Sequence, residues 1–254
     1  MTLQAGSDQI GFEMETDWHC HNKLLRLVFP TNIAGGEAYF DQPYGYVKRN
    51  ESPKEVPGQN WIDYSNSLCG LSLINDGKYG FTVNEGILTM SVVRGAREMD
   101  PRMDEGKHSF KYALIVHENS WRGAHIPLRA IELNQPLLVK QEDKHPGEIS
   151  GWAHARESFP AEKSFFYLNS DHVIISSLKI RQDSYDPNPV ILRIVETEGR
   201  DDDVTVQLPY KPGKVTECNH IEQPVEPRSE IKVEEKQFRF HIGHDQIRTF
   251  MIQF

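Results

Sequence analysis

One central stretch of the sequence reads Tyr79-Gly80-Phe81-Thr82-Val83-Asn84-Glu85-Gly86-Ile87-Leu88-Thr89-Met90-Ser91-Val92-Val93. On both sides of Asn84-Glu85-Gly86, β-branched and aromatic residues alternate with small or polar ones, which is typical of half-buried strands. The three residues between them are of types that tolerate the positive φ angles of a tight hairpin. The stretch therefore predicts two antiparallel strands joined by a short turn.

The same period of two residues recurs in both directions from this hairpin. Upstream, Ile10–Thr16 and Lys23–Phe29 alternate apolar and polar side chains. Further strands are predicted at Gly70–Ile74, Ser109–His117, Arg129–Leu133, Val173–Arg181, Val190–Glu196, Val204–Leu208, Lys214–Glu217, Gln237–Ile242 and Arg248–Gln253. Almost no window shows the 3.6-residue period of a helix. Many short strands separated by Gly, Pro, Asn and Asp predict an all-β chain built from antiparallel sandwiches.

The alternation stops at Gln141–Pro160, where charged residues, Pro and Gly follow one another without a period. Such a stretch indicates a domain boundary or a long connection between sheets. The remainder, Lys163–Phe254, is about the size of a small second sandwich. We therefore expect two successive β domains.

Composition and charge exclude several classes of protein. The 254 residues include 28 Lys and Arg against 37 Asp and Glu, a formal net charge of −9, whereas a groove for nucleic acid needs the opposite balance. The longest apolar stretches contain Arg26 or Arg193 and are far shorter than the roughly 20 residues of a membrane span, and the N-terminus does not read as a secretory signal. The cysteines Cys20, Cys69 and Cys218 are widely spaced, which indicates a reducing compartment, the cytoplasm, without a disulfide framework.

Asp17-Trp18-His19-Cys20-His21 is the stretch with the most reactive side chains. If a strand continued through it, Asp17, His19 and His21 would point to one face and could bind a first-row metal. Three polar side chains on the solvent face of a strand would give the same pattern. No motif for a nucleophile or a phosphate-binding loop is present.

Two further clusters fall in predicted loops. Arg94–Gly106 mixes Arg and Asp directly after a predicted strand, where binding residues of a rigid sandwich are often carried, although a solvated loop would have the same composition. Asn75–Gly80 has the composition of a turn and is interpreted as a structural corner.

Six segments, in this order, carry further information: Thr16–Pro30, Pro43–Arg49, Glu55–Asp63, Leu71–Phe81, Arg94–His108 and Glu132–Leu137. Within them stand the strings Thr16-Asp17-Trp18-His19-Cys20-His21-Asn22-Lys23, Val56-Pro57-Gly58-Gln59-Asn60-Trp61-Ile62-Asp63 and Glu132-Leu133-Asn134-Gln135-Pro136-Leu137. Together they resemble the C-terminal half of glycoside hydrolase family 38 α-mannosidases. The resemblance spans nearly the whole chain.

The resemblance implies a galactose-mutarotase-like β-supersandwich over residues 1–158 and a small C-terminal β-sandwich over residues 159–254. It also implies that the zinc ligands and the Asp nucleophile of a retaining α-mannosidase lie in an N-terminal α/β barrel, joined to this half by a helical bundle. A retaining mechanism needs two carboxyl groups about 5–5.5 Å apart, and nothing here resembles the segment that supplies the nucleophile. We therefore expect this chain to hold no cofactor and to be inactive alone.

The same resemblance names partners and site residues. The expected partners are the catalytic and helical domains of the same enzyme and an α-mannoside, and an apolar face left without those domains would favour a homo-oligomer. The loop after Arg94 matches the loop that closes over the sugar, so Arg94, Asp100 and Asp104 are expected to line the site of the intact enzyme. Because the family's zinc ligands come from the other half, we interpret Asp17, His19 and His21 as ordinary strand residues.

Two other functions stay open at this point. A free-standing carbohydrate-binding module would need exposed aromatic faces, and four tryptophans are available: Trp18, Trp61, Trp121 and Trp152. A mutarotase-like epimerase would need a His base and a carboxylate paired across a concave sheet, and no such pair can be named from the sequence. Fold alone does not decide between these functions.

Overall fold

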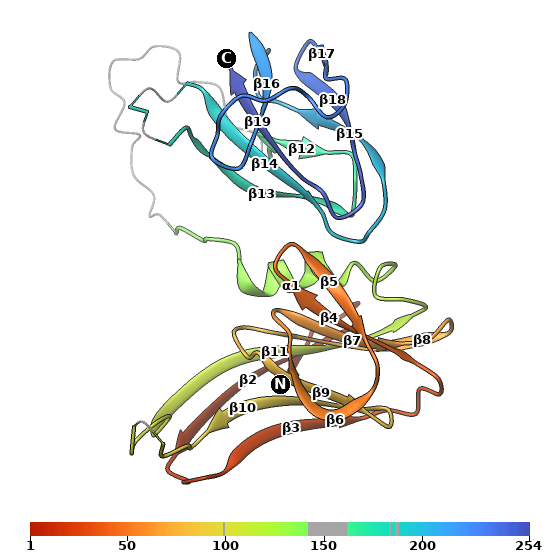
Figure 1. Cartoon of the computed structure of the whole chain (residues 1–254), viewed down its shortest axis with the longest axis vertical. Helices are drawn as coiled ribbons and strands as arrows, with labels where there is room; N and C mark the ends of the chain where they lie inside the picture. Colours follow the sequence, from red (N-terminus) through yellow and green to blue (C-terminus); the bar gives the residue numbers. More distant parts are fainter. Residues whose placement is uncertain (99, 142–161, 183, 186–187) are drawn as a thin grey trace.

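A computed structural model describes residues 1–98, 100–141, 162–182, 184–185 and 188–254. Four antiparallel sheets in these residues form two sandwiches, one above the other in Figure 1. The expected all-β class is confirmed, with one short helix in the described part of the chain. No helix there is long and apolar enough to cross a membrane.

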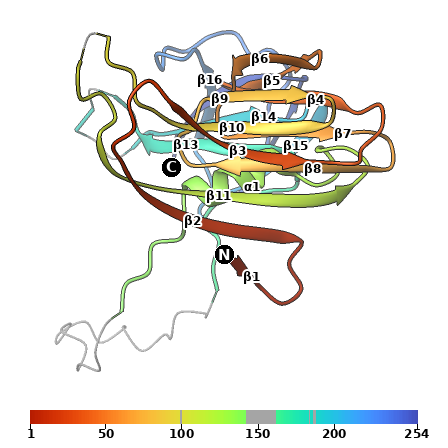
Figure 2. The ribbon, with the colours of Figure 1, turned by 90° about the horizontal axis from the view of Figure 1, so that it is seen from below.

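The first sandwich pairs a seven-stranded sheet, in the order β1-β2-β11-β8-β7-β4-β5, with a four-stranded sheet, in the order β3-β10-β9-β6. Figure 2 shows β1 at one edge of the larger sheet, beyond β2. The strands are β1 Thr2–Leu3, β2 Gln9–Trp18, β3 Leu24–Pro30, β4 Glu37–Gln42, β5 Gly45–Arg49, β6 Ser52–Pro57, β7 Trp61–Ser65, β8 Cys69–Asn75, β9 Gly80–Asn84, β10 Ile87–Arg94 and β11 Gly106–Glu118.

The second sandwich has two four-stranded sheets, in the orders β12-β15-β18-β17 and β13-β14-β19-β16. Its strands are β12 Tyr167–Leu168, β13 Val173–Ile180, β14 Val190–Glu196, β15 Asp202–Gln207, β16 Lys214–Cys218, β17 Lys232–Glu234, β18 Gln237–Ile242 and β19 Ile247–Gln253. Inward-facing residues of both sheets, among them Leu192, Val204 and Phe250, form its core. The predicted division between residues 158 and 159 lies outside the described residues, and so does Trp152.

The hairpin predicted at Asn84-Glu85-Gly86 is confirmed. β9 and β10 pair in register from Ile87 and Asn84 to Ser91 and Gly80. Glu85 and Gly86 have φ angles of 52° and 73°, which match the positive φ values that a two-residue hairpin turn requires. The turn therefore forms where the sequence placed it.

The larger sheet of the first sandwich is covered on both faces. On one face, residues such as Ile62 and Leu73 form a core with Phe81 and other residues of the smaller sheet. The other face, which includes Trp61 and Ile74, lies beneath the α-helix α1 and the segment before it. This second layer places α1 between the two sandwiches (Figure 1).

The strand predicted at Arg129–Leu133 is wrong, because these residues belong to α1, Ile126–Asn134. Ile126 and Ala130 stand four residues apart and are buried on one side of the helix against the sheet. Pro127 lies in the first turn, where a missing backbone N–H has no cost. In so short a segment, the helical spacing of these residues is easily mistaken for the alternation of a strand.

Candidate functional site

The loop that carries the predicted sugar-site residues begins where β10 ends. Arg94 is exposed, whereas the next residue, Gly95, is buried against the segment after β2. The backbone N–H of Gly95 donates to the carbonyl of Lys23 at 3.0 Å, and that of Asn22 donates to the carbonyl of Gly95 at 2.5 Å. A Cβ on Gly95 would lie 1.9 Å from the carbonyl oxygen of Cys20, so only glycine fits there. The start of the loop is therefore firmly fixed.

Two of the four acidic residues of this loop, Asp100 and Asp104, form local hydrogen bonds. The Asp100 carboxylate accepts a hydrogen bond from the backbone N–H of Arg102 at 2.9 Å, and the Asp104 carbonyl lies 2.8 Å from His108 Nε2. Arg94, Asp100 and Asp104 are all exposed, and among the described residues Arg94 forms no ion pair with either carboxylate. The three side chains thus share one exposed loop without bracing it through charge.

The stretch with Asp17, His19 and His21 does not form a shared metal site. β2 ends at Trp18, and beyond it His19 Nε2 lies 2.8 Å from the Asp17 carboxylate. His21 Nδ1 instead lies 3.4 Å from Glu105 in the Arg94 loop. Among the described residues, no group of three His, Cys, Asp or Glu side chains could hold a metal ion.

Asn75–Gly80 forms the structural corner that its composition indicates. The Asn75 side chain accepts a hydrogen bond from the backbone N–H of Lys78 at 2.6 Å and donates one to the carbonyl of Gln59 at 2.9 Å. Gly77 adopts a φ of 98°, which favours glycine. These contacts tie the turn to the neighbouring segment.

A buried polar cluster that the sequence did not reveal lies on the helix-covered face of the larger sheet. The Asp63 carboxylate accepts hydrogen bonds from Ser72 Oγ at 2.6 Å and from His117 Nε2 at 2.8 Å, and Ser65 Oγ donates to its other oxygen at 2.5 Å. The residue types are those of a catalytic triad. However, the side chains of Asp63 and His117 are only 0% and 3% exposed, so no substrate reaches them. The cluster satisfies buried polar groups and does not supply the pair that an epimerase needs.

The two sandwiches are joined by a polar cluster around Glu198, whose side chain is almost fully buried. His125 Nδ1 lies 3.2 Å from one carboxylate oxygen of Glu198, and Arg200 donates to the other at 2.6 Å. Burial raises the pKa of Glu198 above its ordinary value, while the interactions with Arg200 and His125 oppose that shift. Nearby, a Cβ on Gly199 would lie 2.3 Å from the hydroxyl of Tyr46 in the first sandwich. The contact between the sandwiches is therefore close.

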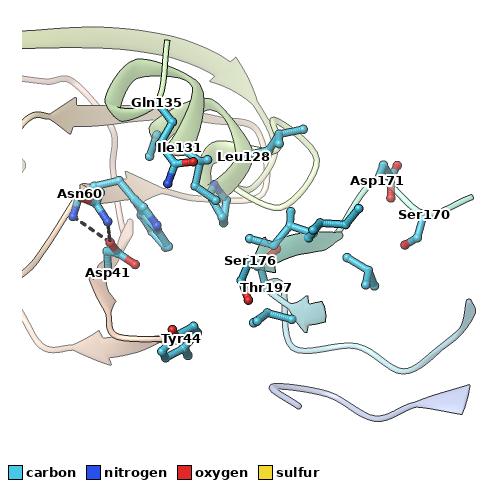
Figure 3. A pocket seen from close by; sticks show the side chains of 18 of the residues that line it. Asp41, Tyr44, Asn60, Leu128, Ile131, Gln135, Ser170, Asp171, Ser176 and Thr197 are labelled. Atoms are coloured by element: carbon cyan, nitrogen blue, oxygen red, sulfur yellow. Dashed lines mark hydrogen bonds between the residues drawn. The ribbon is translucent and has the colours of Figure 1, made fainter. Parts of the chain in front are cut away.

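A cleft of about 680 Å³, here named the inter-sandwich cleft, opens beside this contact. One wall comes from the β4–β5 turn, the segment before β7, and α1, and the other comes from β12, β13 and the end of β14 (Figure 3). Its polar lining residues are Asp41, Gln42, Tyr44, Gln59, Asn60, Gln135, Tyr167, Ser170, Asp171, Ser176 and Thr197.

Asp41 lines the inter-sandwich cleft and is itself buried. Asn60 donates two hydrogen bonds to one carboxylate oxygen of Asp41, from its backbone N–H at 2.7 Å and from its side-chain amide at 3.0 Å. The second carboxylate oxygen points away from Asn60 in Figure 3. Burial raises the pKa of Asp41 to about 6, although these hydrogen bonds partly oppose the shift. Asp41 is thus a fixed acceptor that titrates near neutral pH.

Comparison with family models finds two successive matches. Residues 1–102 match the glycosyl hydrolases family 38 C-terminal domain, and residues 172–250 match the glycosyl hydrolases family 38 C-terminal beta sandwich domain. Among curated proteins, the chain is 26% identical to alpha-mannosidase 2C1 of Homo sapiens, over 99% of this chain and 24% of that protein. It is 24% identical to alpha-mannosidase of Saccharomyces cerevisiae, over 82% of this chain and 20% of that protein.

Comparison with solved structures supports the fold. A glycosyl hydrolase family 38 protein from Enterococcus faecalis superposes with a TM-score of 0.79 at 17% identity, over 97% of this chain and 28% of that chain. An alpha-mannosidase from the same species gives a TM-score of 0.77 at 16% identity, over the same shares of the two chains. The chain thus spans about a quarter of the length of the proteins it matches.

Proposed function

Since the chain belongs to glycoside hydrolase family 38, as a C-terminal part of its members, we propose that it is the non-catalytic C-terminal region of an α-mannosidase that hydrolyses terminal α-mannosides in oligosaccharide metabolism. The observation that carries this proposal is the pair of successive C-terminal domain matches, one in each sandwich. The zinc and the nucleophile would then come from the remaining three quarters of the enzyme. The catalytic and helical domains in that part are the proposed partners.

The Arg94 loop is the proposed contribution of this region to catalysis. It is exposed at one end of the first sandwich, and the close approach of Gly95 to Cys20 fixes its start. A guanidinium has five donors for sugar hydroxyls. In the described residues, the guanidinium of Arg94 forms no ion pair with Asp100 or Asp104. We therefore assign Arg94, Asp100 and Asp104 to the wall of the sugar site.

The proposed compartment is the cytoplasm. Cys20 and Cys69 are exposed free thiols and Cys218 is a buried one. Exposed free cysteines suit a reducing environment, where they stay unpaired. This supports the same location that the spacing of the cysteines predicts.

Activity measurements test the proposal. The 254-residue chain is compared with the same chain extended N-terminally by its preceding coding sequence to the length of its relatives, with 4-nitrophenyl α-mannoside as substrate. We expect turnover by the extended protein and none by the chain alone, with or without zinc. Turnover by the repurified chain alone would refute the non-catalytic role, and an inactive, well-folded extended protein would refute the α-mannosidase assignment.

A further inference from the structure

The inter-sandwich cleft has the chemistry of a ligand site, and the proposed function does not use it. Its volume of about 680 Å³ lies within the usual range for small-molecule pockets. Figure 1 shows the Arg94 loop, between β10 and β11, at the end of the first sandwich away from α1 and the second sandwich. The cleft is therefore separate from the proposed sugar-site wall.

The charge of the lining limits what can bind. Asp41 and Asp171 both line the cleft, and the described lining residues include no Lys, Arg or His. A phosphate or carboxylate group would meet the carboxylates of Asp41 and Asp171. Asp171 pairs with Arg200 at 3.5 Å from outside the lining, whereas Asp41 forms no ion pair among the described residues. The lining thus selects against anionic ligands.

Three glutamine amides of the lining are free to bind. The side chains of Gln42, Gln59 and Gln135 line the cleft and form no hydrogen bond with another described residue. Each amide offers both a donor and an acceptor, and a hydroxyl group can also do both. An uncharged molecule with several hydroxyl groups could therefore pair its hydroxyl groups with these amides.

Apolar surface completes the lining. Tyr44, at the tip of the β4–β5 turn, is 55% exposed and lies beside the cleft in Figure 3. Leu128 and Ile131 face the cleft from α1. A sugar ring has an apolar C–H face and a polar hydroxyl edge. An aromatic ring with aliphatic neighbours can pack against the apolar C–H face.

We propose that the inter-sandwich cleft binds an uncharged sugar, with the ring against Tyr44 and the hydroxyl groups on Asp41 and the glutamine amides. The fixed Asp41 carboxylate would accept charge-assisted hydrogen bonds from hydroxyl groups through the oxygen that points away from Asn60. The site is a second sugar site, and only the choice of a mannoside as its ligand rests on the proposed function.

Binding to the 254-residue chain is measured by saturation-transfer NMR and calorimetric titration with α1,2-mannobiose, maltose, mannose 6-phosphate and glucosamine. We expect the wild-type chain to bind mannobiose, and the variants Tyr44→Ala and Gln135→Ala to bind it about fivefold more weakly or worse. Both residues are exposed, so the variants are expected to fold. Tyr79→Ala is the matched control, because Tyr79 is an exposed tyrosine of the same sandwich outside the cleft.

Three results would overturn the site: no binding of either neutral disaccharide at about 10 mM, affinities unchanged in both cleft variants, or tighter binding of mannose 6-phosphate or glucosamine than of the disaccharides. Binding of maltose but not mannobiose would keep the sugar site and count against the mannoside specificity of the proposed function. Failure of this site and failure of the α-mannosidase assignment are therefore distinguishable.

Discussion

Arg122 in the first sandwich donates a hydrogen bond from Nε to the backbone carbonyl of Glu198 in the second, over 2.6 Å and across 76 residues of sequence. Its Nη2 donates to the hydroxyl of Tyr46 at 2.7 Å, and its guanidinium carbon lies 4.3 Å from the centroid of the Trp121 ring. Because the donors of a guanidinium have a fixed, planar arrangement, this side chain contributes, together with the His125–Glu198 contact, to the orientation of the two sandwiches. The shape of the inter-sandwich cleft depends on that orientation.

The first prediction is that Arg122→Ala loosens the two sandwiches without unfolding either. The carbonyl of Glu198 and the hydroxyl of Tyr46 lose their partner, so we expect the free energy of unfolding to fall by about 1–3 kcal/mol. Small-angle scattering should show a larger radius of gyration, and calorimetry should separate two melting transitions. Arg122→Lys should show the same changes in scattering and melting, whereas the control Arg97→Ala, at an exposed arginine, should behave like the wild type. A single, unshifted transition in Arg122→Ala would contradict this role.

The second prediction concerns the ion pair inside the second sandwich. Arg248 donates from Nε and Nη2 to the two carboxylate oxygens of Glu217, each at 2.7 Å, and both side chains are at most 2% exposed. Glu217→Ala leaves the cation buried without its counter-ion, although Ser229 and the carbonyl of His241 still accept from it, so we expect the free energy of unfolding in urea to fall by about 3–5 kcal/mol. The exposed Glu234→Ala should change stability by less than about 0.5 kcal/mol. A similar, small loss in both variants would show that water replaces the carboxylate.

The third prediction follows from the raised pKa of Asp41. Burial raises this pKa from 3.8 to about 6, so between pH 4 and pH 6 the folded chain retains a proton that the unfolded chain has lost. The contribution of Asp41 to stability therefore falls as the pH rises through this window, by about 3 kcal/mol in total, and is constant above it. Asp41→Asn has no titrating group at this position, so it lacks this pH-dependent change in stability.

Unfolding free energies of wild type and Asp41→Asn should be measured from pH 4 to pH 7.5. Carboxylates with lowered pKa values, such as Asp171 beside His172, contribute equally to both proteins and cancel in the difference. Relative to the variant, the wild type should lose stability as the pH rises. A difference that is constant with pH would show that Asp41 titrates normally and is solvated.

The strands that the sequence predicts well are those with a clear pattern: β18 alternates buried and exposed residues, and β14 is mostly buried but is rich in β-branched residues. β14, Val190–Glu196, and β18, Gln237–Ile242, have the predicted bounds, and the β9–β10 hairpin forms at its predicted turn. β7 was not predicted, since all five of its residues are buried. Ile62 and Tyr64 lie on the face toward the smaller sheet, and the opposite face carries the apolar Trp61 together with the polar Asp63 and Ser65, so the alternation of apolar and polar residues is interrupted.

The candidate sites also differ in how far the sequence predicts them. The Arg94 loop is continuous in sequence and could be found from its motif. In contrast, Asp63 and His117 are 54 residues apart and meet only because β7, β8 and β11 are neighbours in one sheet. The inter-sandwich cleft draws on Asp41, Gln135 and Thr197, whose proximity depends on how the sandwiches dock, and local sequence carries no signal of that docking.

The last prediction is that Arg94 acts through the sugar site and not through stability. In the extended enzyme, Arg94→Ala should lower kcat/KM at least tenfold, the loss of about 1.4 kcal/mol of transition-state stabilisation, because a guanidinium that donates to sugar hydroxyls is removed. The melting temperature should stay unchanged, since Arg94 forms no ion pair with Asp100 or Asp104 in the described part of the chain. Arg102→Ala, an exposed arginine of the same loop, is the matched control and should retain activity. If kcat/KM falls only in proportion to lost folded protein, or equally in both variants, then Arg94 acts as a brace of the loop, and the loop does not reach the sugar.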